Sequence, residues 1–218
     1  MTVRIAVMLD ENTSKGGQSY ELPKNYMRAI VREGALPYGI PYCDDFTSSA
    51  AREFDGFLSV GGGIAFPEEW YEPGYTSPFP PSERLAIETG IMRSFLEANK
   101  PVLGICHGMQ LLGALHGCRL RGVSPLHREA HEVGIVPGTL LHDLAGTPRL
   151  RVNSRHGEGI FQTPPLVTAS ARSEDGLAEA LEIPPHPFAV GVQWHQEDFL
   201  EADHPGNGIF SAFVSACR

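Results

Sequence analysis

The chain has 218 residues, of which 42% are hydrophobic, and its formal net charge is -9 at pH 7. This length and composition predict one domain over residues 1–218 with a well-buried sheet, and exclude a second catalytic domain of ordinary size. A negative charge without a cluster of Lys and Arg argues against nucleic acid and anionic membrane, so we expect a small molecule or a protein as partner, with a homodimer left open.

Neither the cysteines nor the N-terminus indicates an exported or membrane protein. The four cysteines lie far apart without a C-x-x-C motif, which argues against a zinc ribbon and a disulfide framework; they are Cys43, Cys106, Cys118 and Cys217. No run approaches the roughly 18 apolar residues of a membrane span, and the opening MTVRIAVMLDENTSK carries Asp and Glu too early for a secretory signal. We therefore expect a cytoplasmic protein.

Apolar strands alternate with amphipathic helices in the first half of the chain. The expected elements are a strand over Val3–Leu9, a helix over Lys24–Glu33, strands over Leu36–Pro41 and Asp55–Val60, a helix over Glu83–Asn99 and a strand over Pro101–Ile105. The i,i+4 pairs Tyr26 with Ile30 and Met27 with Val31 predict the buried face of the first helix. Ser82 is the expected N-cap of the second helix. This order is typical of a parallel sheet covered on both faces.

Short strands separated by Gly and Pro turns follow in the second half. They are expected over Val133–Val136, Leu150–Val152, Leu166–Ala171, Leu177–Ile183 and Phe188–Trp194. A helix over Ile209–Cys217, with Asn207 as its expected cap, closes the chain. The predicted fold class is therefore α/β, a mostly parallel central sheet flanked by helices with an added antiparallel or mixed β part.

A cysteine flanked by glycines stands between the apolar strand and the apolar helix of Pro101–Gly113, PVLGICHGMQLLG. Gly104 and Gly108 give G-x-C-x-G around Cys106, the thiol counterpart of the G-x-S-x-G nucleophile elbow. A helix that starts at such a turn aims free N–H groups at the sulfur and favours the thiolate. Cys106 is therefore a candidate nucleophile; a buried cysteine at a strand end is the alternative interpretation.

A cysteine nucleophile needs a base, and the base needs an orienting group. The apolar strand Phe188–His195, FAVGVQWH, ends in a histidine, and Glu197 follows two residues later. On extended backbone, residues i and i+2 point the same way, so Glu197 is expected beside His195. The pattern predicts Cys106, His195 and Glu197 as nucleophile, base and orienter; a solvated strand end is the alternative for a His-x-Glu taken alone.

Three glycines end the strand of Asp55–Gly63, DGFLSVGGG, and leave backbone N–H groups uncovered by side chains. If the N–H groups of Gly62 and of His107, the residue after the nucleophile, converge, they would stabilise the oxyanion of acyl transfer. A phosphate cradle is disfavoured because neither G-x-G-x-x-G opening a helix nor G-x-x-x-x-G-K-[ST] is present. A plain tight turn is the remaining alternative.

Three segments together resemble a known family. PVLGICHGMQLLG, VNSRHGEGI (Val152–Ile160) and GVQWHQE (Gly191–Glu197) resemble the class I glutamine amidotransferase superfamily, in particular its free-standing γ-glutamyl hydrolases of the peptidase C26 type, such as the γ-glutamyl-γ-aminobutyrate hydrolases. The resemblance implies a flavodoxin-like fold and a cysteine-dependent hydrolase that cleaves γ-glutamyl amides through a thioester. The alternative is a glutaminase subunit that delivers ammonia to a separate synthetase.

The resemblance also implies roles for individual residues. Cys106, His195 and Glu197 would be the triad, and Gly62 would lie in the oxyanion hole. Gln110 matches a glutamine that contacts the γ-glutamyl group in relatives. The loop that receives the α-amino and α-carboxylate groups of the substrate matches Asn153, Ser154, Arg155 and His156.

Four positions depart from the family pattern. Gly157 and Glu158 stand where many γ-glutamyl hydrolases carry His and Gln in VNSxHHQ. Ile64 stands where relatives often carry an acidic residue, and Gln196 where they carry Pro. Because these positions lie where the leaving group or the glutamyl head would be read, the amide chemistry is indicated more strongly than any named substrate.

A segment rich in proline and aromatic residues, Phe66–Pro81, follows the glycines. Proline at this density prevents regular helix or sheet, and the aromatic side chains of Trp70, Tyr71, Tyr75 and Phe79 are costly to leave in water. Two interpretations stay open: a lid whose aromatic residues wall the amine-leaving side and select the amine, and a surface loop packed by its own aromatic residues.

Nine histidines raise the question of a metal site, because His127 and His131 of HREAH would share one face of a helix. Zinc sites usually need three or four ligands at defined spacing, and H-E-x-x-H is absent from the sequence. Pro125 also argues against a long helix. We therefore expect neither a metal nor another cofactor, and interpret His131 as a hydrogen-bonded polar group ahead of a short strand.

Overall fold

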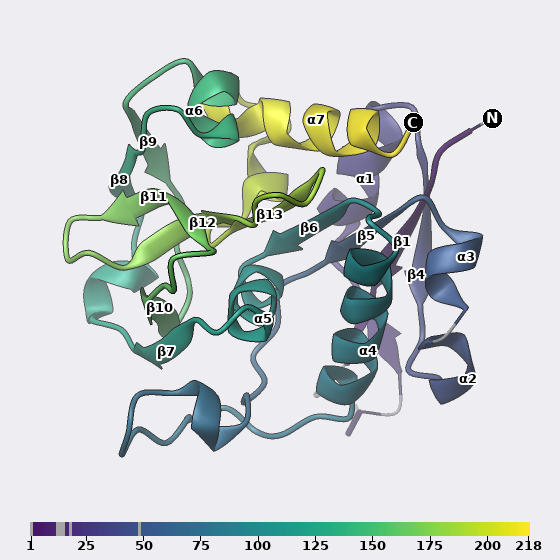
Figure 1. The fold of residues 1–218 in the computed structure, drawn as a ribbon, viewed down its shortest axis with the longest axis horizontal. Helices are drawn as coiled ribbons and strands as arrows, with labels where there is room; N and C mark the ends of the chain where they lie inside the picture. Colours follow the sequence, from purple (N-terminus) through teal and green to yellow (C-terminus); the bar gives the residue numbers. More distant parts are fainter. Residues whose placement is uncertain (1, 12–15, 18, 48) are drawn as a thin grey trace.

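The computed structural model describes residues 2–11, 16–17, 19–47 and 49–218. Its centre is an 11-stranded sheet in the order β4-β1-β5-β6-β13-β12-β11-β8-β9, with β10 paired to β12 and to β7 (Figure 1). The strands of this sheet are β1 (Arg4–Met8), β4 (Leu36–Ile40), β5 (Gly56–Ser59), β6 (Val102–Ile105), β7 (Arg119–Gly122), β8 (His131–Ile135), β9 (Arg149–Val152), β10 (Glu158–Gln162), β11 (Thr168–Ser173), β12 (Ala178–Glu182) and β13 (Ala189–Val192). A separate hairpin pairs β2 (Asp10–Glu11) with β3 (Tyr20–Glu21).

Helices cover both faces of the central strands: α4 and α5 lie on one side and α1 and α7 on the other (Figure 1). The α-helices are α1 (Lys24–Arg32), α2 (Asp44–Thr47), α3 (Ala50–Glu53), α4 (Arg84–Glu97), α5 (His107–Leu115), α6 (Leu140–Ala145) and α7 (Gly208–Ala216). Short 3-10 helices are η2 (Glu68–Trp70), η3 (Pro125–Arg128), η4 (Gln196–Phe199) and η5 (Pro205–Asn207). The expected α/β fold is confirmed.

The parallel half of the sheet consists of β4, β1, β5, β6 and β13, all paired in parallel. Every residue of β5, β6 and β13 is buried. Such continuous apolar runs are what strands covered by helices on both faces require. The carboxyl ends of these strands therefore meet at one edge of a rigid core.

The antiparallel half begins where β13 pairs with β12 and continues through β11, β8 and β9. Burial alternates along β8 and β9, so one face of each strand meets the core and the other meets solvent. No pattern in the sequence predicts β7, β10 or α6. Two of these are the short strands that pair with each other beside α5.

Four details of the predicted elements are wrong. Val31 is 57% exposed, although Tyr26 and Ile30 of the same helix are buried. Leu166 is 76% exposed, because β11 begins only at Thr168. Asn207 stands at the cap position of α7, but its side chain donates to the carbonyls of Phe199 and Ala202 and accepts from Gln196 instead of capping. The fourth is the backbone between His195 and Glu197, which is a 3-10 turn at the candidate site instead of an extended strand.

At the start of α4 the Ser82 hydroxyl accepts a hydrogen bond from the Arg84 backbone N–H at 3.0 Å, although Glu83 occupies the cap position.

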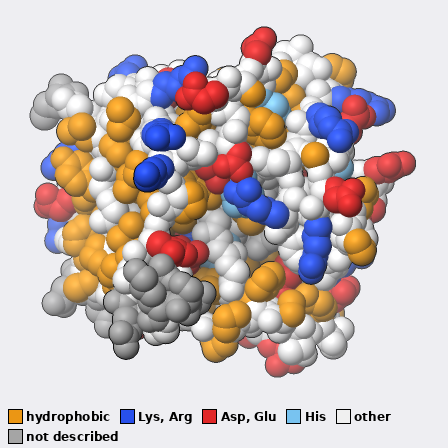
Figure 2. Space-filling view, turned by 180° about the vertical axis from the view of Figure 1, so that it is seen from behind, with side chains coloured by type: hydrophobic (Ala, Val, Ile, Leu, Met, Phe, Trp, Pro, Cys, Tyr) orange, Lys and Arg blue, Asp and Glu red, His pale blue; other side chains and the backbone are white. Residues whose placement is uncertain are grey.

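No helix in the described part of the chain combines the length and apolar character that a membrane span requires. On the face seen in Figure 2, Lys and Arg side chains are interspersed with Asp and Glu. Residues 12–15 of the N-terminal segment considered above for a secretory signal lie outside the described residues.

Candidate active site

Cys106 lies on a sharp turn between β6 and α5, with φ +53° and ψ -104°. A positive φ is costly for a residue with a Cβ and persists only where the surroundings hold it. A Cβ on Gly104 would lie 2.5 Å from the carbonyl of Gly108, and one on Gly108 would collide with the backbone of Ser59. Both glycines are therefore needed for the close packing that holds the strained cysteine.

Three neighbouring parallel strands bring their carboxyl ends to the cysteine. Gly61 follows β5, Cys106 follows β6 and His195 lies just beyond β13. A Cβ on Gly61 would lie 2.8 Å from His195 Cε1 and 3.7 Å from Cys106 Cβ, so the three segments meet at one point. The crevice beyond the carboxyl ends of parallel strands is the usual ligand site of open α/β sheets.

The imidazole of His195 lies between Glu197 and Cys106. Nδ1 lies 2.7 Å from Glu197 Oε1, and Glu197 is 1% exposed. Burial lowers the pKa of His195, but hydrogen bonding to Cys106 and Glu197 outweighs it and raises the pKa to about 9. The ring is therefore held with Nδ1 on the carboxylate, which favours its charged form.

The expected reason for the closeness of His195 and Glu197 is wrong. The residues do not continue β13 as a strand; His195 caps the 3-10 helix η4, which contains Glu197. The tight turn brings the carboxylate back to the imidazole. Asn153 fixes the entry to this turn, since its Oδ1 accepts from the His195 N–H at 2.8 Å and its Nδ2 donates to the His195 carbonyl at 3.0 Å.

Tyr26, which the sequence indicates only as a core residue of α1, also contacts the site. Its hydroxyl accepts from the Gly61 N–H at 3.1 Å and lies 3.3 Å from His195 Nδ1. Burial, followed by the charge of Glu197, raises the pKa of Tyr26 well above its ordinary value. The hydroxyl thus stays protonated and ties the glycine segment to the histidine.

The fully buried side chain of Arg84 binds the backbone of the glycine segment. It donates to the carbonyls of Val60 and Gly61, each at 2.9 Å. The guanidinium also pairs with Glu88, at 2.9 Å from Nε to Oε2, and with Asp10 at 2.9 Å. Burial would raise the pKa of Glu88, but Arg84 holds it at about 2. An i,i+4 Arg–Glu pair usually indicates a solvated helix face, so no pattern in the sequence indicates this role.

The predicted oxyanion donors stand at the same edge. The Gly62 N–H donates to no backbone acceptor among the described residues, and a Cβ there would lie 2.5 Å from Arg84 Nη1. His107 is the first residue of α5. Its side chain faces away from this edge, with Nε2 3.4 Å from Glu88 Oε2 and its ring stacked on Phe66. Burial lowers the pKa of His107. The convergence of the two N–H groups stays a prediction.

The loop of Asn153, Ser154, Arg155 and His156 lies against this edge, but three of its side chains make protein contacts. Asn153 binds the His195 backbone, the Ser154 hydroxyl donates to the His127 carbonyl, and the His156 Nδ1 lies 2.8 Å from the Glu158 carbonyl. Arg155 is more than half exposed, with its guanidinium 2.8 Å from Asp198 and 3.8 Å from Glu197. Among these four, Arg155 has the exposed side chain, although it is paired with Asp198.

Gln110 and Glu158 link the nucleophile helix to the loop. The buried Gln110 amide donates to the Glu158 carbonyl at 2.7 Å and to Gln193 Oε1 at 3.1 Å. The Glu158 carboxylate is buried and accepts from the hydroxyls of Tyr71 at 2.9 Å and Tyr75 at 3.2 Å. The departure from the family pattern at Glu158 thus anchors the Phe66–Pro81 segment.

Phe79 reaches the site from the same segment. A Cβ on Gly63 would lie 3.3 Å from its ring and one on Gly157 would lie 3.4 Å from it. The ring therefore lies between the last of the three glycines and the substituted position of the loop. Tyr71 and Tyr75 hold the segment through Glu158, and Trp70 packs against Phe66, whereas Phe79 lies against the glycines of the site.

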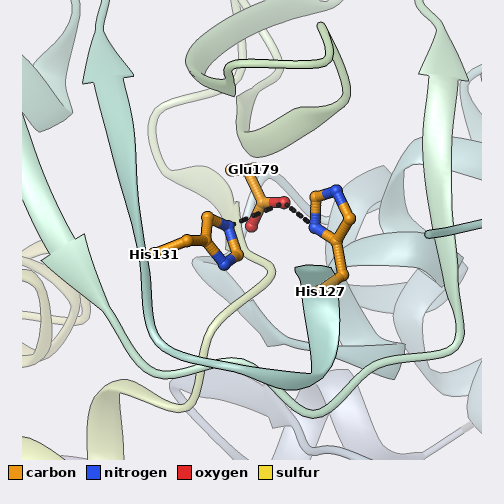
Figure 3. Close-up of side chains that lie close together, drawn as sticks. All are labelled: His127, His131 and Glu179. Atoms are coloured by element: carbon orange, nitrogen blue, oxygen red, sulfur yellow. Dashed lines mark ion pairs between the residues drawn. The ribbon is translucent and has the colours of Figure 1, made fainter. Parts of the chain in front are cut away.

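A second cluster lies in the antiparallel half. His127, His131 and Glu179 each offer a ligand atom, and these atoms lie within 4.8 Å of one another (Figure 3). His127 lies in η3, and His131 is the first residue of β8, so the two histidines do not share a helix. The interpretation of His131 as a hydrogen-bonded group holds for Nδ1 but not for Nε2, which has no hydrogen-bond partner in the described residues.

Comparisons with known proteins agree with the fold and with the family resemblance. Residues 3–197 match the Peptidase C26 family model. A γ-glutamyl-γ-aminobutyrate hydrolase of Escherichia coli O157:H7 is 30% identical over 98% of this chain and 93% of its own. A glutamine amidotransferase of Thermotoga maritima has a TM-score of 0.70 at 18% identity and covers 100% of this chain and 98% of its own. The CTPS glutaminase domain of Trypanosoma brucei with bound acivicin has a TM-score of 0.70 at 17% identity, over 99% and 94%.

Proposed function

The chain belongs to the Peptidase C26 family, and from this premise we propose that it hydrolyses the amide bond between a γ-glutamyl group and an amine. The relative's name supports the substrate class, because that protein acts on γ-glutamyl-γ-aminobutyrate. The reaction consists of two acyl transfers through a γ-glutamyl thioester on Cys106, and it releases glutamate and the amine.

In the first step the Cys106 thiolate attacks the γ-carbonyl carbon. A carbon–sulfur bond forms, and the N–H groups of Gly62 and His107 stabilise the oxyanion. The carbon–nitrogen bond then breaks as the His195 imidazolium gives its proton to the departing nitrogen. A pKa of about 9 keeps His195 charged at neutral pH, which suits this role.

In the second step, His195, now neutral, takes a proton from water. The hydroxide adds to the thioester carbonyl, the carbon–sulfur bond breaks, and glutamate leaves with the thiolate restored. Glu197 holds Nδ1 of the imidazole throughout and offsets the charge that His195 carries in the first step. Both steps thus use one positioned imidazole in opposite protonation states.

The observation that carries the proposal is the arrangement of Cys106, His195 and Glu197. A cysteine held at positive φ at the start of a helix lies beside a histidine whose Nδ1 is 2.7 Å from a buried carboxylate. A cysteine with only a packing role needs neither the strain nor the paired imidazole. This arrangement supports nucleophilic catalysis over a retired or purely structural site.

Arg155 and Phe79 are the side chains that we assign to substrate recognition. The half-exposed guanidinium of Arg155 would pair with the α-carboxylate of the glutamyl head. Asp198, which Arg155 now contacts at 2.8 Å, would then pair with the α-amino group. Phe79 would contact the amine, because it lies beside Gly63 and Gly157 at the rim.

Glutamate release tests the function. The purified chain and its Cys106→Ala variant are incubated with glutamine, γ-glutamyl-γ-aminobutyrate and other γ-glutamyl amines, and products are followed by mass spectrometry. We expect release from at least one γ-glutamyl amine by the wild type alone. Slow release from glutamine only would favour a glutaminase subunit, and equal release by both chains would refute the role of Cys106.

A further inference from the structure

Three histidines surround one buried carboxylate in the antiparallel half of the sheet. His127 Nδ1 lies 3.1 Å from Glu179 Oε1, and the Nε2 atoms of His131 and His156 each lie 3.6 Å from the same oxygen. All four residues are at least nine-tenths buried. Figure 3 shows His127 and His131 approaching the carboxylate from either side. The four come from η3, β8, β12 and the loop after β9.

The outer nitrogen of each ring already has a partner. His127 Nε2 lies 3.0 Å from Asp175, His131 Nδ1 3.0 Å from the Glu129 carbonyl, and His156 Nδ1 2.8 Å from the Glu158 carbonyl. Carbonyl and carboxylate oxygens only accept, so each outer nitrogen must carry the proton. In a neutral ring the inner nitrogen then presents a lone pair.

In neutral rings these lone pairs face a carboxylate that cannot donate to them. Among the described residues the three inner nitrogens and both oxygens of Glu179 have no hydrogen-bond partner. Protonating all three rings would place three cations around one buried carboxylate, which is costly at low dielectric. One cation among them would satisfy the inner nitrogens of His127 and His131 and the carboxylate together.

We propose that His127 Nδ1, His131 Nε2 and Glu179 bind a zinc-type divalent cation, and that His156, whose Nε2 lies 3.6 Å from the same carboxylate oxygen, packs beside the site. Two His and one Glu is a ligand set that zinc uses. In a tetrahedral site, two atoms at ordinary zinc–ligand distances lie about 3.3 Å apart. Glu179 Oε1 lies 3.1 Å from His127 Nδ1 and 3.6 Å from His131 Nε2, and these two separations bracket that value. Outer-nitrogen contacts to a carboxylate and to carbonyls are the usual second shell of such histidines.

One of the three ligands borders a cavity. His131 lines a cavity of about 380 Å³ together with Leu126, Glu132, Arg149, Arg172 and Glu174. The cavity lies over β8, β9 and β11, away from Cys106. Asp175, on the other side of His127, is itself about one-third exposed. The cluster is therefore buried, but His131 and Asp175 separate it from solvent on two sides.

The site would fix the loop that positions the catalytic histidine. His156 belongs to that loop, and Ser154 of the same loop donates to the His127 carbonyl. Asn153 binds the backbone of His195. A bound ion would thus tie η3, β8, β12 and the loop together, in a structural role that does not depend on the amide hydrolysis proposed above.

Zinc binding is tested on the full chain carrying Cys106→Ala, because the cysteine and His195 could hold zinc by themselves. After EDTA treatment and dialysis, Zn²⁺ is titrated by calorimetry and melting is followed with and without the ion. We expect one equivalent to bind and to raise Tm by about 5 °C at saturating zinc. His131→Gln and Glu179→Gln should lose at least about ten-fold in affinity.

His142→Gln is the matched control, since His142 lies on α6 with its side chain partly exposed beside Asp143. It should bind zinc as the parent does. No stoichiometric binding, or binding retained in both His131→Gln and Glu179→Gln, would overturn the proposal. Should these variants not fold, Co²⁺ bound to the parent decides: imidazole and carboxylate ligands give weak d–d bands, whereas a sulfur charge-transfer band would place the ion on a cysteine and contradict the site.

Discussion

The parallel and antiparallel halves of the sheet meet at the candidate active site, and they contribute to it in different ways. The parallel half supplies Cys106, the three glycines and, at its last strand, His195. Its three strands next to the site, β5, β6 and β13, are buried along their length, and Arg84 and Tyr26 bind the glycine segment directly. The antiparallel half supplies the Asn153–His156 loop and Glu158, to which the Phe66–Pro81 segment is bound.

This difference indicates how the chain separates chemistry from recognition. In the proposed mechanism, the groups that attack, donate a proton or stabilise an oxyanion lie at the ends of rigid parallel strands, where small errors of position are costly. Groups that would meet the substrate lie on loops, and the departures from the family pattern at Gly157 and Glu158 fall there. Changes in the first region should therefore affect all substrates alike, and changes in the second should alter their ranking.

Among variants that keep the nucleophile, Glu197→Gln is expected to have the largest effect on catalysis. Loss of the carboxylate should lower kcat/KM by about 10⁴-fold for every γ-glutamyl amine, as loss of the acid does in other triads. Because His195 must be protonated to release the amine, the rate should fall as pH rises through about 9. Removing the opposite charge lowers that pKa, so the alkaline limb should move down by about one pH unit or more.

A pH profile of kcat/KM measures this shift. Glu201→Gln serves as the control, since Glu201 is an exposed carboxylate a few residues away. Its alkaline limb should coincide with that of the wild type. An unmoved limb in Glu197→Gln would show that Glu197 does not set the protonation of His195.

Arg84→Met should have the largest effect on stability. It leaves Glu88 buried without its cation, which we expect to cost about 3–5 kcal/mol of unfolding free energy. The double variant Arg84→Met with Glu88→Leu should regain most of that loss, because neither charge is then buried unpaired. Urea denaturation measures both.

Arg93→Met is the matched control, because Arg93 is an exposed arginine on the same helix. It should change the stability by less than about 0.5 kcal/mol. If Arg84→Met alone is as stable as the wild type, the ion pair between Arg84 and Glu88 does not support the glycine segment.

Tyr26→Phe should have a smaller effect that is uniform across substrates. It removes the hydroxyl between the Gly61 N–H and His195 Nδ1 and leaves the ring in place. We expect kcat to fall about ten-fold, the equivalent of one hydrogen bond of about 1.4 kcal/mol. The exposed Tyr38→Phe should leave kcat unchanged. A loss in Tyr26→Phe that differed widely between amines would place Tyr26 in recognition instead.

Phe79→Ala should have the smallest effect on the reaction and the clearest effect on selectivity. We expect the relative kcat/KM of bulky and small γ-glutamyl amines to change by about ten-fold, the value of one apolar contact. Thioester formation from glutamine, whose leaving group is ammonia, should stay within about two-fold. Steady-state rates on both substrate types give the ratio, and a ratio equal to that of the wild type would exclude Phe79 from amine selection.

The sequence predicts the parallel half well because its signals are local. Apolar runs identify β5, β6 and β13, and G-x-C-x-G predicts the strained turn at Cys106. The closeness of His195 and Glu197 is predicted, but through extended backbone rather than the turn of η4. Which strands are neighbours, and hence that Gly61 lies against His195, requires the fold or the family resemblance.

The antiparallel half is less predictable because its contacts join distant segments. The short strands β7 and β10 carry no periodic pattern long enough to be recognised. Glu179 lies 52 residues after His127, and no spacing rule connects them. Arg84 and Glu88 have the spacing of a solvated helix pair, and only burial shows otherwise. These functional candidates become visible only in three dimensions.

The most direct test of the account is the detection of the γ-glutamyl thioester on Cys106. The wild type is mixed with a γ-glutamyl amine that it cleaves, quenched in acid during turnover, and analysed by intact-mass and peptide mass spectrometry. We predict an added mass of one γ-glutamyl group on the peptide that contains Cys106, and no adduct or turnover in Cys106→Ala. Turnover by Cys106→Ala, or an adduct on another residue, would contradict the account.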